Sequence, residues 1–193
     1  MNIHYKIEFF TDWHCGSGLS AGVDLDALVV KDKNHLPFIP GKTIKGLIRE
    51  AVEELDRLSE TQQIDAIKKA FGFFSKDENK REIEAVKGEC FFTNATVPPV
   101  LANAVISEKT AKYFYRTISS TKINNDGVAE EHSLRKMQVT IPCCLEGKII
   151  NIPDKSMAEI LKNGLRFIKR LGQNRNRGLG RCVITVIEKE DGI

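Results

Sequence analysis

The chain has 193 residues and a mass of 21.7 kDa, a size that suggests one domain. Hydrophobic residues make up 41% and charged residues 28%, so the chain can bury a core and is not expected to be disordered. The apolar runs are short, which excludes a membrane-spanning helix, and an N-terminus of alternating polar and apolar residues predicts a cytoplasmic protein.

The five cysteines are odd in number and scattered, and none are spaced as Cys-x-x-Cys. This pattern argues against a zinc ribbon and against a disulfide framework. We expect four of the five to be small core side chains, because they lie among apolar residues.

Apolar periodicity divides the first half of the chain into short strands and amphipathic helices. A helix is expected just after Pro40, because apolar residues recur at helical spacing from Ile44 to Leu55. Ser59 and Gln62 have the spacing of a capping box at the start of a second helix. The other expected elements are strands at 3–10 and 25–30, a loop at 13–22, the second helix at 62–71 and an exposed connection at 75–87.

The second half contains a long polar insertion. Residues 104–138 include Asn124-Asn125-Asp126-Gly127, a strong reverse-turn signal, and predict an inserted hairpin. A capping box of Ser156 and Glu159 predicts the start of a further helix. The remaining elements are a strand at 90–97 stopped by two prolines, two strand runs within 139–152 broken near residue 146, a helix at 156–171, a loop at 172–180 and a strand at 181–188.

The order strand, helix, strand, strand, helix, strand predicts an α+β fold with a ferredoxin-like (RRM-like) β-α-β-β-α-β core. We expect residues 1–193 to form a single domain, with 104–138 as the hairpin inserted within it. This plan alone says little about function, because unrelated activities share it.

Positive charge is concentrated in the C-terminal third. Residues 160–187 contain no acidic residue but seven basic ones, a pattern that suggests a bound polyanion, although a charge run is more often a solvated face. Within it, residues 172–181 interleave glycines with Arg175, Arg177 and Arg181, whose forked donors suit phosphate oxygens. Asn174 and Asn176 add donors and acceptors for sugars or bases. The alternative is a tight turn whose basic residues are incidental.

The helix start after Pro40 is a second candidate anion site. Gly41 would let amide groups approach a phosphate at the positive end of the helix dipole, with Lys42 and Lys45 nearby. The Gly-Lys-Thr sequence here is not a P-loop, because Leu36 stands where that motif requires glycine. We expect the two glycine-bearing turns, at Gly41 and Gly178, to converge on one electropositive cleft.

Together these segments resemble the RAMP superfamily of CRISPR effector proteins. The resemblance rests on the helix start over 39–49, on Asn176-Arg177-Gly178-Leu179-Gly180-Arg181, and on the segments 14–18 and 26–32, and it covers nearly the whole chain. The last two segments are similar to the repeated backbone (Cas7-group) subunit of type III complexes. In that family the inserted hairpin is a thumb.

The resemblance implies a subunit that binds crRNA and complementary target RNA, assembles with other CRISPR effector subunits and self-assembles along the RNA, without a membrane. It implies that the thumb is inserted between guide and target. The candidate RNA-binding residues are His14, Gly41, Lys42, Thr43, Lys45, Arg49, Arg135, Lys136, Asn174, Arg175, Arg177, Gly178, Gly180 and Arg181.

The resemblance also implies a catalytic residue. In the type III backbone subunit a loop aspartate serves metal-dependent cleavage of target RNA, and Asp26 matches its position, with Asp24 as a near neighbour. A carboxylate can hold Mg²⁺, which stabilises charge on a phosphoryl oxygen or activates a 2′-hydroxyl. Two alternatives remain: a non-catalytic RNA-binding scaffold, and a metal-independent crRNA-processing nuclease with His14 as general acid or base.

The insertion itself suits single-stranded RNA. Tyr113, Phe114 and Tyr115 could stack on bases, or the last two could belong to the core of a strand. Arg135 and Lys136 are the favoured phosphate contacts, because acidic residues dilute the charge elsewhere in the insertion.

Overall fold

The computed structural model describes residues 1–19, 26–59, 63–76 and 83–187. Its centre is an antiparallel sheet in the order β10-β1-β9-β6-β2, with β5 also paired to β9. The strands are β1 (Ile3–Phe9), β2 (Phe38–Ile39), β5 (Phe91–Phe92), β6 (Ala95–Thr96), β9 (Cys144–Ile150) and β10 (Cys182–Ile187).

This sheet has the strand order of a ferredoxin-like fold, so that prediction is confirmed. The pieces β5 and β6 together form the interrupted second strand, and β9 runs between them and β1. The strand expected over 90–97 is therefore two short strands. The break expected near Glu146 is absent, because β9 is continuous through that residue.

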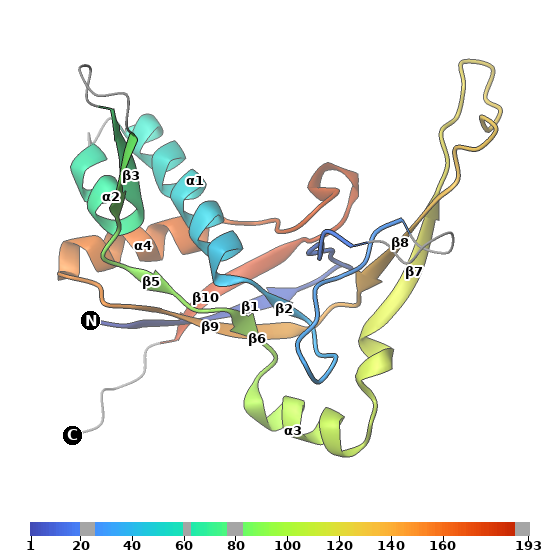
Figure 1. The fold of residues 1–193 in the computed structure, drawn as a ribbon, viewed down its shortest axis with the longest axis horizontal. Coiled ribbons are helices and arrows are strands. Elements are labelled where there is room, and N and C mark those ends of the chain that lie inside the picture. Colours follow the sequence, from blue (N-terminus) through green and yellow to red (C-terminus); the bar gives the residue numbers. More distant parts are fainter. Residues whose placement is uncertain (20–25, 60–62, 77–82, 188–193) are drawn as a thin grey trace.

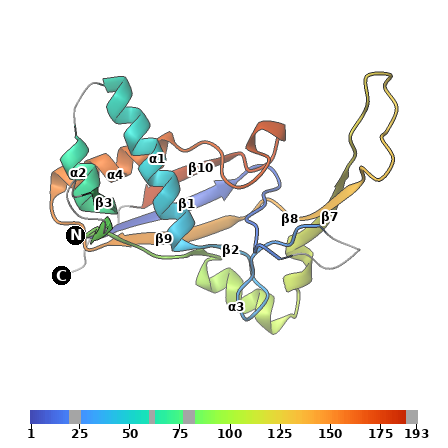
Figure 2. The same ribbon diagram turned by 45° about the horizontal axis from the view of Figure 1, so that its top comes forward.

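Two helices cover one face of the sheet, α1 (Gly41–Ser59) and α4 (Lys155–Phe167), as Figure 2 shows. Alternate residues of β1 and β9 point into this layer; Tyr5 and Leu145, for example, are fully buried. The helices pack closely because α4 has Gly164, where an added Cβ would lie 2.6 Å from Cγ2 of Val52. The opposite face of the sheet carries partly exposed residues such as Lys6.

The helix ends differ from the sequence expectations. The Asp154 carboxylate, and not Ser156, caps α4 by accepting from Met157 N at 2.9 Å. The helix ends at Phe167, four residues before the predicted end. The second helix, α2 (Ile64–Phe71), begins without a side-chain cap, and Gln62 of the expected capping box lies outside the described residues.

Two elements appear where the sequence predicted none. The exposed connection at 75–87 instead contributes to a hairpin of β3 (Gly72–Lys76) and β4 (Ile83–Lys87). A helix, α3 (Pro99–Ser107), begins at the second of the two prolines and takes up the first residues of the predicted insertion. None of the described helices is long and apolar enough to cross a membrane.

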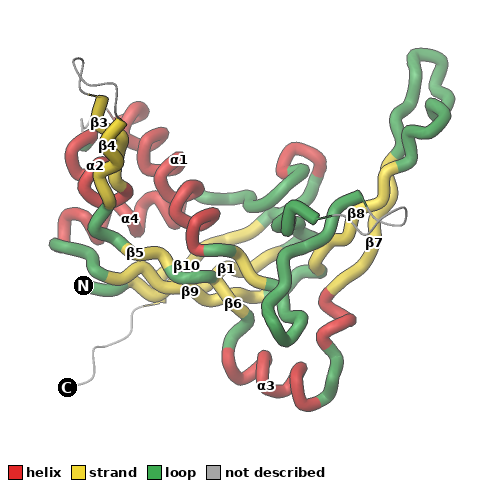
Figure 3. Tube along the Cα trace, viewed as in Figure 1, coloured by secondary structure: helices red, strands yellow, loops and turns green. Residues whose placement is uncertain are grey.

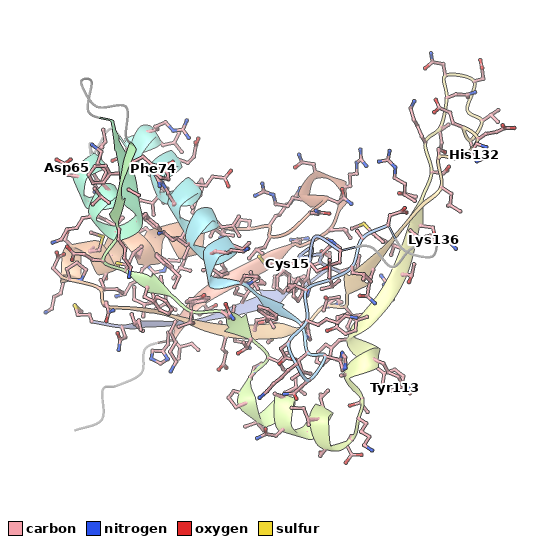
Figure 4. The ribbon with its side chains drawn as sticks, in the orientation of Figure 1. Cys15, Asp65, Phe74, Tyr113, His132 and Lys136 are labelled. Atoms are coloured by element: carbon pink, nitrogen blue, oxygen red, sulfur yellow. The ribbon has the colours of Figure 1, made fainter. Side chains whose placement is uncertain are left out.

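The insertion forms an antiparallel hairpin that projects from the body and is called the thumb below (residues 115–140; Figure 1). Its strands are β7 (Tyr115–Ser120) and β8 (Arg135–Thr140), preceded by a 3₁₀ turn, η1 (Ala111–Phe114). The predicted turn lies in its outer part, where Asn124 Oδ1 accepts from Asp126 N and Val128 N. Figure 4 shows Lys136 partway along the thumb.

The cysteines agree with the expectation of core side chains. Cys15, Cys90 and Cys182 are buried free thiols. Burial raises the pKa of Cys15 and Cys182 to about 11, so both stay protonated at neutral pH.

The two glycines of α1 should respond oppositely to alanine. A Cβ at Gly41 would overlap the Phe92 carbonyl oxygen, whereas a Cβ at Gly46 would have none of the described residues within 4 Å. We expect Gly41→Ala to lower the free energy of unfolding by about 1–3 kcal/mol. Gly46→Ala, the matched control, should raise it by up to about 1 kcal/mol. Urea unfolding measures both, and equal stability of Gly41→Ala and wild type would contradict the packing seen here.

Candidate nucleic-acid interface

The segment 12–16, called the junction segment below, lies between the thumb and the C-terminal loop. On the thumb side, Trp13 and Thr140 exchange backbone hydrogen bonds of 2.9 and 2.8 Å. On the other side, Gly180 N donates to Asp12 O at 2.7 Å and Gln173 N donates to His14 O at 2.9 Å. The junction segment therefore fixes the position of the loop relative to the thumb.

His14 is a structural residue of this junction. Its side chain is only 1% exposed, and Nδ1–H donates to the backbone oxygen of Gln138 in β8 at 2.6 Å. The expectation that His14 touches RNA is therefore wrong in this structure, because protein surrounds the ring. The same burial removes the geometric basis for a general acid or base at this position.

The loop at 172–181, called the arginine loop below, is closed at its base and open at its tip. Leu171 N donates to Gly180 O at 2.9 Å, and a Cβ at Gly180 would overlap the Leu171 carbonyl oxygen. At the tip, Asn174 and Gly178 adopt left-handed conformations, with φ of 56° and 87°. No described residue lies within 4 Å of a Cβ at Gly178, so glycine serves the backbone turn there and not packing. Figure 3 shows this loop with its short helical turn.

The cations of the arginine loop are free to meet a ligand. Arg175, Arg177 and Arg181 are exposed, and none has a carboxylate partner in the part of the chain that the structure describes. Asn174 Nδ2 lies 3.3 Å from the sulfur of Met137, which brings the tip of the loop against β8. Forked guanidinium donors beside an open backbone suit phosphate oxygens.

Asp26 lies at the same place. Its backbone N–H donates to Lys136 O at 2.9 Å, and its Oδ2 accepts from Lys136 N at 2.7 Å. The residue is exposed, and its second carboxylate oxygen has no partner among the described residues. Asp24 lies outside the described residues. The fold thus brings Asp26, Arg135 and Lys136 together, next to the arginine loop.

Sequence reasoning missed the role of Asp12. This carboxylate is 6% exposed and accepts from Arg116 Nε of β7 at 2.6 Å. The pair ties the junction segment to the thumb and largely neutralises Arg116. A buried acid four residues before a glycine-rich loop was the available signal, but its partner is 104 positions away.

The start of α1 does not offer the anion site that we expected. Gly41 N donates to Asn94 Oδ1 at 2.8 Å, and the amides of Thr43 and Ile44 donate to Pro40 O. A phosphate would have to displace these partners. Gly41 is required instead by its contact with the Phe92 backbone.

Of the four cations of α1, Lys42, Lys45 and Arg49 face away from the arginine loop, whereas Arg57 lines the space between the helix and the loop. A hollow of about 410 Å³ lies between α1 and the arginine loop. It is lined by Leu47, Glu50 and Glu54 from the helix and by Arg175 from the loop. Thr43 lies on this face by its spacing, whereas Lys42, Lys45 and Arg49 are rotated onto another face. Arg49 accordingly donates to Glu53 Oε1 at 2.7 Å and to Gly72 O at 3.4 Å. The two glycine-bearing turns, at Gly41 and Gly178, thus do not form one electropositive cleft. The candidate RNA surface beside the arginine loop is formed by the junction segment and the thumb.

Comparison with known proteins agrees with this fold. The family model of the RAMP superfamily matches residues 6–183. The chain therefore belongs to the RAMP superfamily. No curated protein matches the chain.

Two solved structures share the fold across almost their full length. A chain of a type III-B Cmr-beta complex bound to cognate target RNA superposes with a TM-score of 0.68 at 14% identity, covering 96% of this chain and 97% of that one. A chain of the apo state of type III-B Cmr-beta gives 0.67 at 12% identity, covering 98% of each chain.

His14→Ala should act on stability and not through an exposed surface. The substitution removes a buried ring and leaves the Gln138 carbonyl without its donor, so we expect unfolding to be easier by about 2–4 kcal/mol. The contrasting variant, Arg177→Ala at an exposed position, should change stability by no more than about 0.5 kcal/mol. Thermal and urea unfolding compare the two. A His14→Ala protein as stable as wild type would contradict the structural role.

Proposed function

We propose that this chain is an RNA-binding backbone subunit of a type III-like CRISPR ribonucleoprotein. The observation that carries the proposal is the convergence of the unpaired cations of the arginine loop with Asp26 and the foot of the thumb. Family membership and the shared fold of a Cmr-beta chain from an RNA-bound complex support it.

In this proposal the arginine loop holds the crRNA backbone. Arg175, Arg177 and Arg181 donate to phosphate oxygens, and the open backbone at Gly178 lets the strand come close. Such contacts release counterions, so binding should weaken steeply with salt.

The thumb supplies the second part of the function. It projects well beyond the body (Figure 1), so it can reach along an RNA strand or toward a neighbouring copy. Arg135, which shares the Met137 face of β8, would contact the strand where it passes the arginine loop, and Lys136 would contact RNA on the opposite face of the thumb. Complementary target RNA, other effector subunits and further copies along the crRNA are the partners that this arrangement fits.

We further propose that Asp26 serves metal-dependent cleavage of target RNA. The described residues contain no group of three or more metal-ligating side chains, so the protein does not form a complete metal site there. One carboxylate with a free oxygen fits a Mg²⁺ ion that is also held by RNA phosphates and water. When bound, that ion would stabilise charge on the phosphoryl oxygen or activate the attacking 2′-hydroxyl.

The protein's own contribution is orientation. Both hydrogen bonds between Asp26 and the Lys136 backbone fix the carboxylate at the edge of β8, where the target strand would pass the thumb. The alternative is a scaffold that binds RNA without cleaving it. Such a scaffold would bind RNA with the same salt dependence. It would not cut the RNA, whichever metal ion is present.

The arginine loop gives the first test. Arg177→Ala combined with Arg181→Ala should weaken binding of single-stranded RNA about tenfold or more, across sequences, and lower the salt slope by about 1.4, because each single-strand phosphate contact contributes about 0.7. The matched control is Lys68→Ala with Lys155→Ala, which removes two cations from the far end of the molecule. If the arginine variant binds like the control, the loop has only a structural role and the proposed interface is wrong.

Asp26→Asn gives the second test. Asparagine keeps an oxygen that can accept from Lys136 N but removes the charge that a metal ion requires. In the assembled complex with Mg²⁺ and complementary RNA, we expect crRNA binding to be unchanged and periodic cleavage to fall by a factor of about 100 or more. Asp65→Asn, at an exposed position on α2, is the control. Undiminished cuts in Asp26→Asn would remove this residue from the mechanism, and no cuts in wild type would support the scaffold.

A further inference from the structure

A basic hollow lies at the foot of the thumb, mainly on the face away from the arginine loop. Its volume is about 560 Å³, and it is lined by the segment around Lys31 and His35, by the end of α3 and η1, and by the thumb strands. Figures 1 and 2 both show α3 and the arginine loop on opposite sides of the thumb foot.

The register of the thumb explains why its two faces differ. Thr117 and Gln138 are paired and share one face with Tyr115, and all three line the hollow. Met137 belongs to the other face, where it contacts Asn174 of the arginine loop. Arg116 also starts from that face and pairs with Asp12, but its side chain lines the hollow as well. Apart from Arg116, the thumb side chains that line the hollow thus lie on the face away from Met137 and the arginine loop.

Cations dominate the hollow. Lys31, Lys109 and Lys112 line it, and none forms an ion pair within the described part of the chain. No described lining residue is acidic. The nearby Asp32 is not one of the lining residues, and its Oδ1 accepts from the amides of Asn34 and Leu36 at 2.8 Å.

One of these lysines is held in place. Lys31 Nζ lies 4.1 Å from the centre of the Tyr115 ring, and the hydroxyl of that tyrosine donates to His35 O at 2.7 Å. Burial lowers the pKa of Lys31, so its ammonium has lost part of its hydration. An anion would restore the lost interactions.

Two further features are unusual for a surface hollow. His35 and Lys109 both have left-handed backbones, with φ of 61° and 53°, although neither is glycine; such strain is concentrated at binding sites. Gln138 Oε1 is buried without a hydrogen-bond partner among the described residues, so a ligand hydroxyl or amino group could satisfy it.

The walls are suited to a base as well as a phosphate. Val105, Ile106 and Ala111 give the hollow an apolar side next to its lysines. A volume of about 560 Å³ is in the range of small-molecule sites. An apolar wall beside cations and an aromatic ring matches the composition of single-stranded nucleic-acid sites.

We propose that this hollow binds a nucleotide of single-stranded RNA, with its phosphate at Lys31, Lys109 and Lys112 and its base against the apolar wall. This rests on the proposed function and extends it: one subunit holds two RNA segments, one on each face of the thumb.

The test removes two charges from the hollow and keeps a polar side chain at each position. Lys109→Gln with Lys112→Gln shortens each side chain but leaves its first two methylene groups, and Lys68→Gln with Lys155→Gln is a control of equal charge change at the far end. The full chain is titrated with an unstructured polyuridine RNA at several salt concentrations. We expect the hollow variant to bind roughly tenfold more weakly than the control, with a salt slope lower by about 1.4. Combined with Arg177→Ala and Arg181→Ala, its loss should add, because the two sites are separate.

The outcomes separate this inference from the proposed function. If the hollow variant binds RNA like its control while the arginine variant is weakened, the inference is overturned and the proposed function stands. If neither variant is weakened, both fail. If the hollow variant loses self-association in sedimentation but keeps its RNA affinity, the hollow binds protein and the inference is overturned. Unfolding in urea checks that both variants are folded, and Lys31→Gln repeats the test at the held lysine.

Discussion

The arrangement of the functional surface depends on how the junction segment is held on both sides. Backbone hydrogen bonds connect Trp13 to Thr140 of β8, and others connect Asp12 and His14 to the arginine loop. The buried His14 ring and the buried Asp12 carboxylate reinforce the thumb side. Because an unpaired buried polar group is costly, neither residue can be exchanged freely. A loop near the C-terminus and a mid-chain hairpin therefore keep a fixed relation, which a multi-contact RNA site requires.

With the arginine loop and the thumb held in this relation, the two faces of the thumb form two different surfaces. One faces the arginine loop and has Asp26 at its edge, and the other closes over the hollow with Lys31. An antiparallel ladder sends neighbouring side chains to opposite faces, so the same two strands can serve two RNA segments through largely different side chains. The start of α1 contributes to neither surface, because the amides of Gly41, Thr43 and Ile44 already donate to Asn94 and Pro40.

The sequence was sufficient to predict the main elements of the core. It was insufficient to predict the long-range contacts of the candidate site. Periodicity placed the long strands and α1, and strand order led to the ferredoxin-like plan, since each of these depends on local pattern. The hairpin from Gly72 was missed because Phe74 is 75% exposed, so no buried alternation marks it. Pro99 at the first turn of α3 was an available helix signal that we read only as a stop. His14 could not be interpreted correctly, because its partner is a backbone carbonyl 124 positions away.

The central claim is that RNA lies between the arginine loop and the foot of the thumb. Photocrosslinking of the full chain to single-stranded RNA containing 4-thiouridine, followed by peptide mapping, tests it most directly. We expect crosslinked peptides from 172–181 and 135–140. Crosslinks confined to α2 and the β3–β4 hairpin, or to the open face of the sheet at Lys6, would contradict this account.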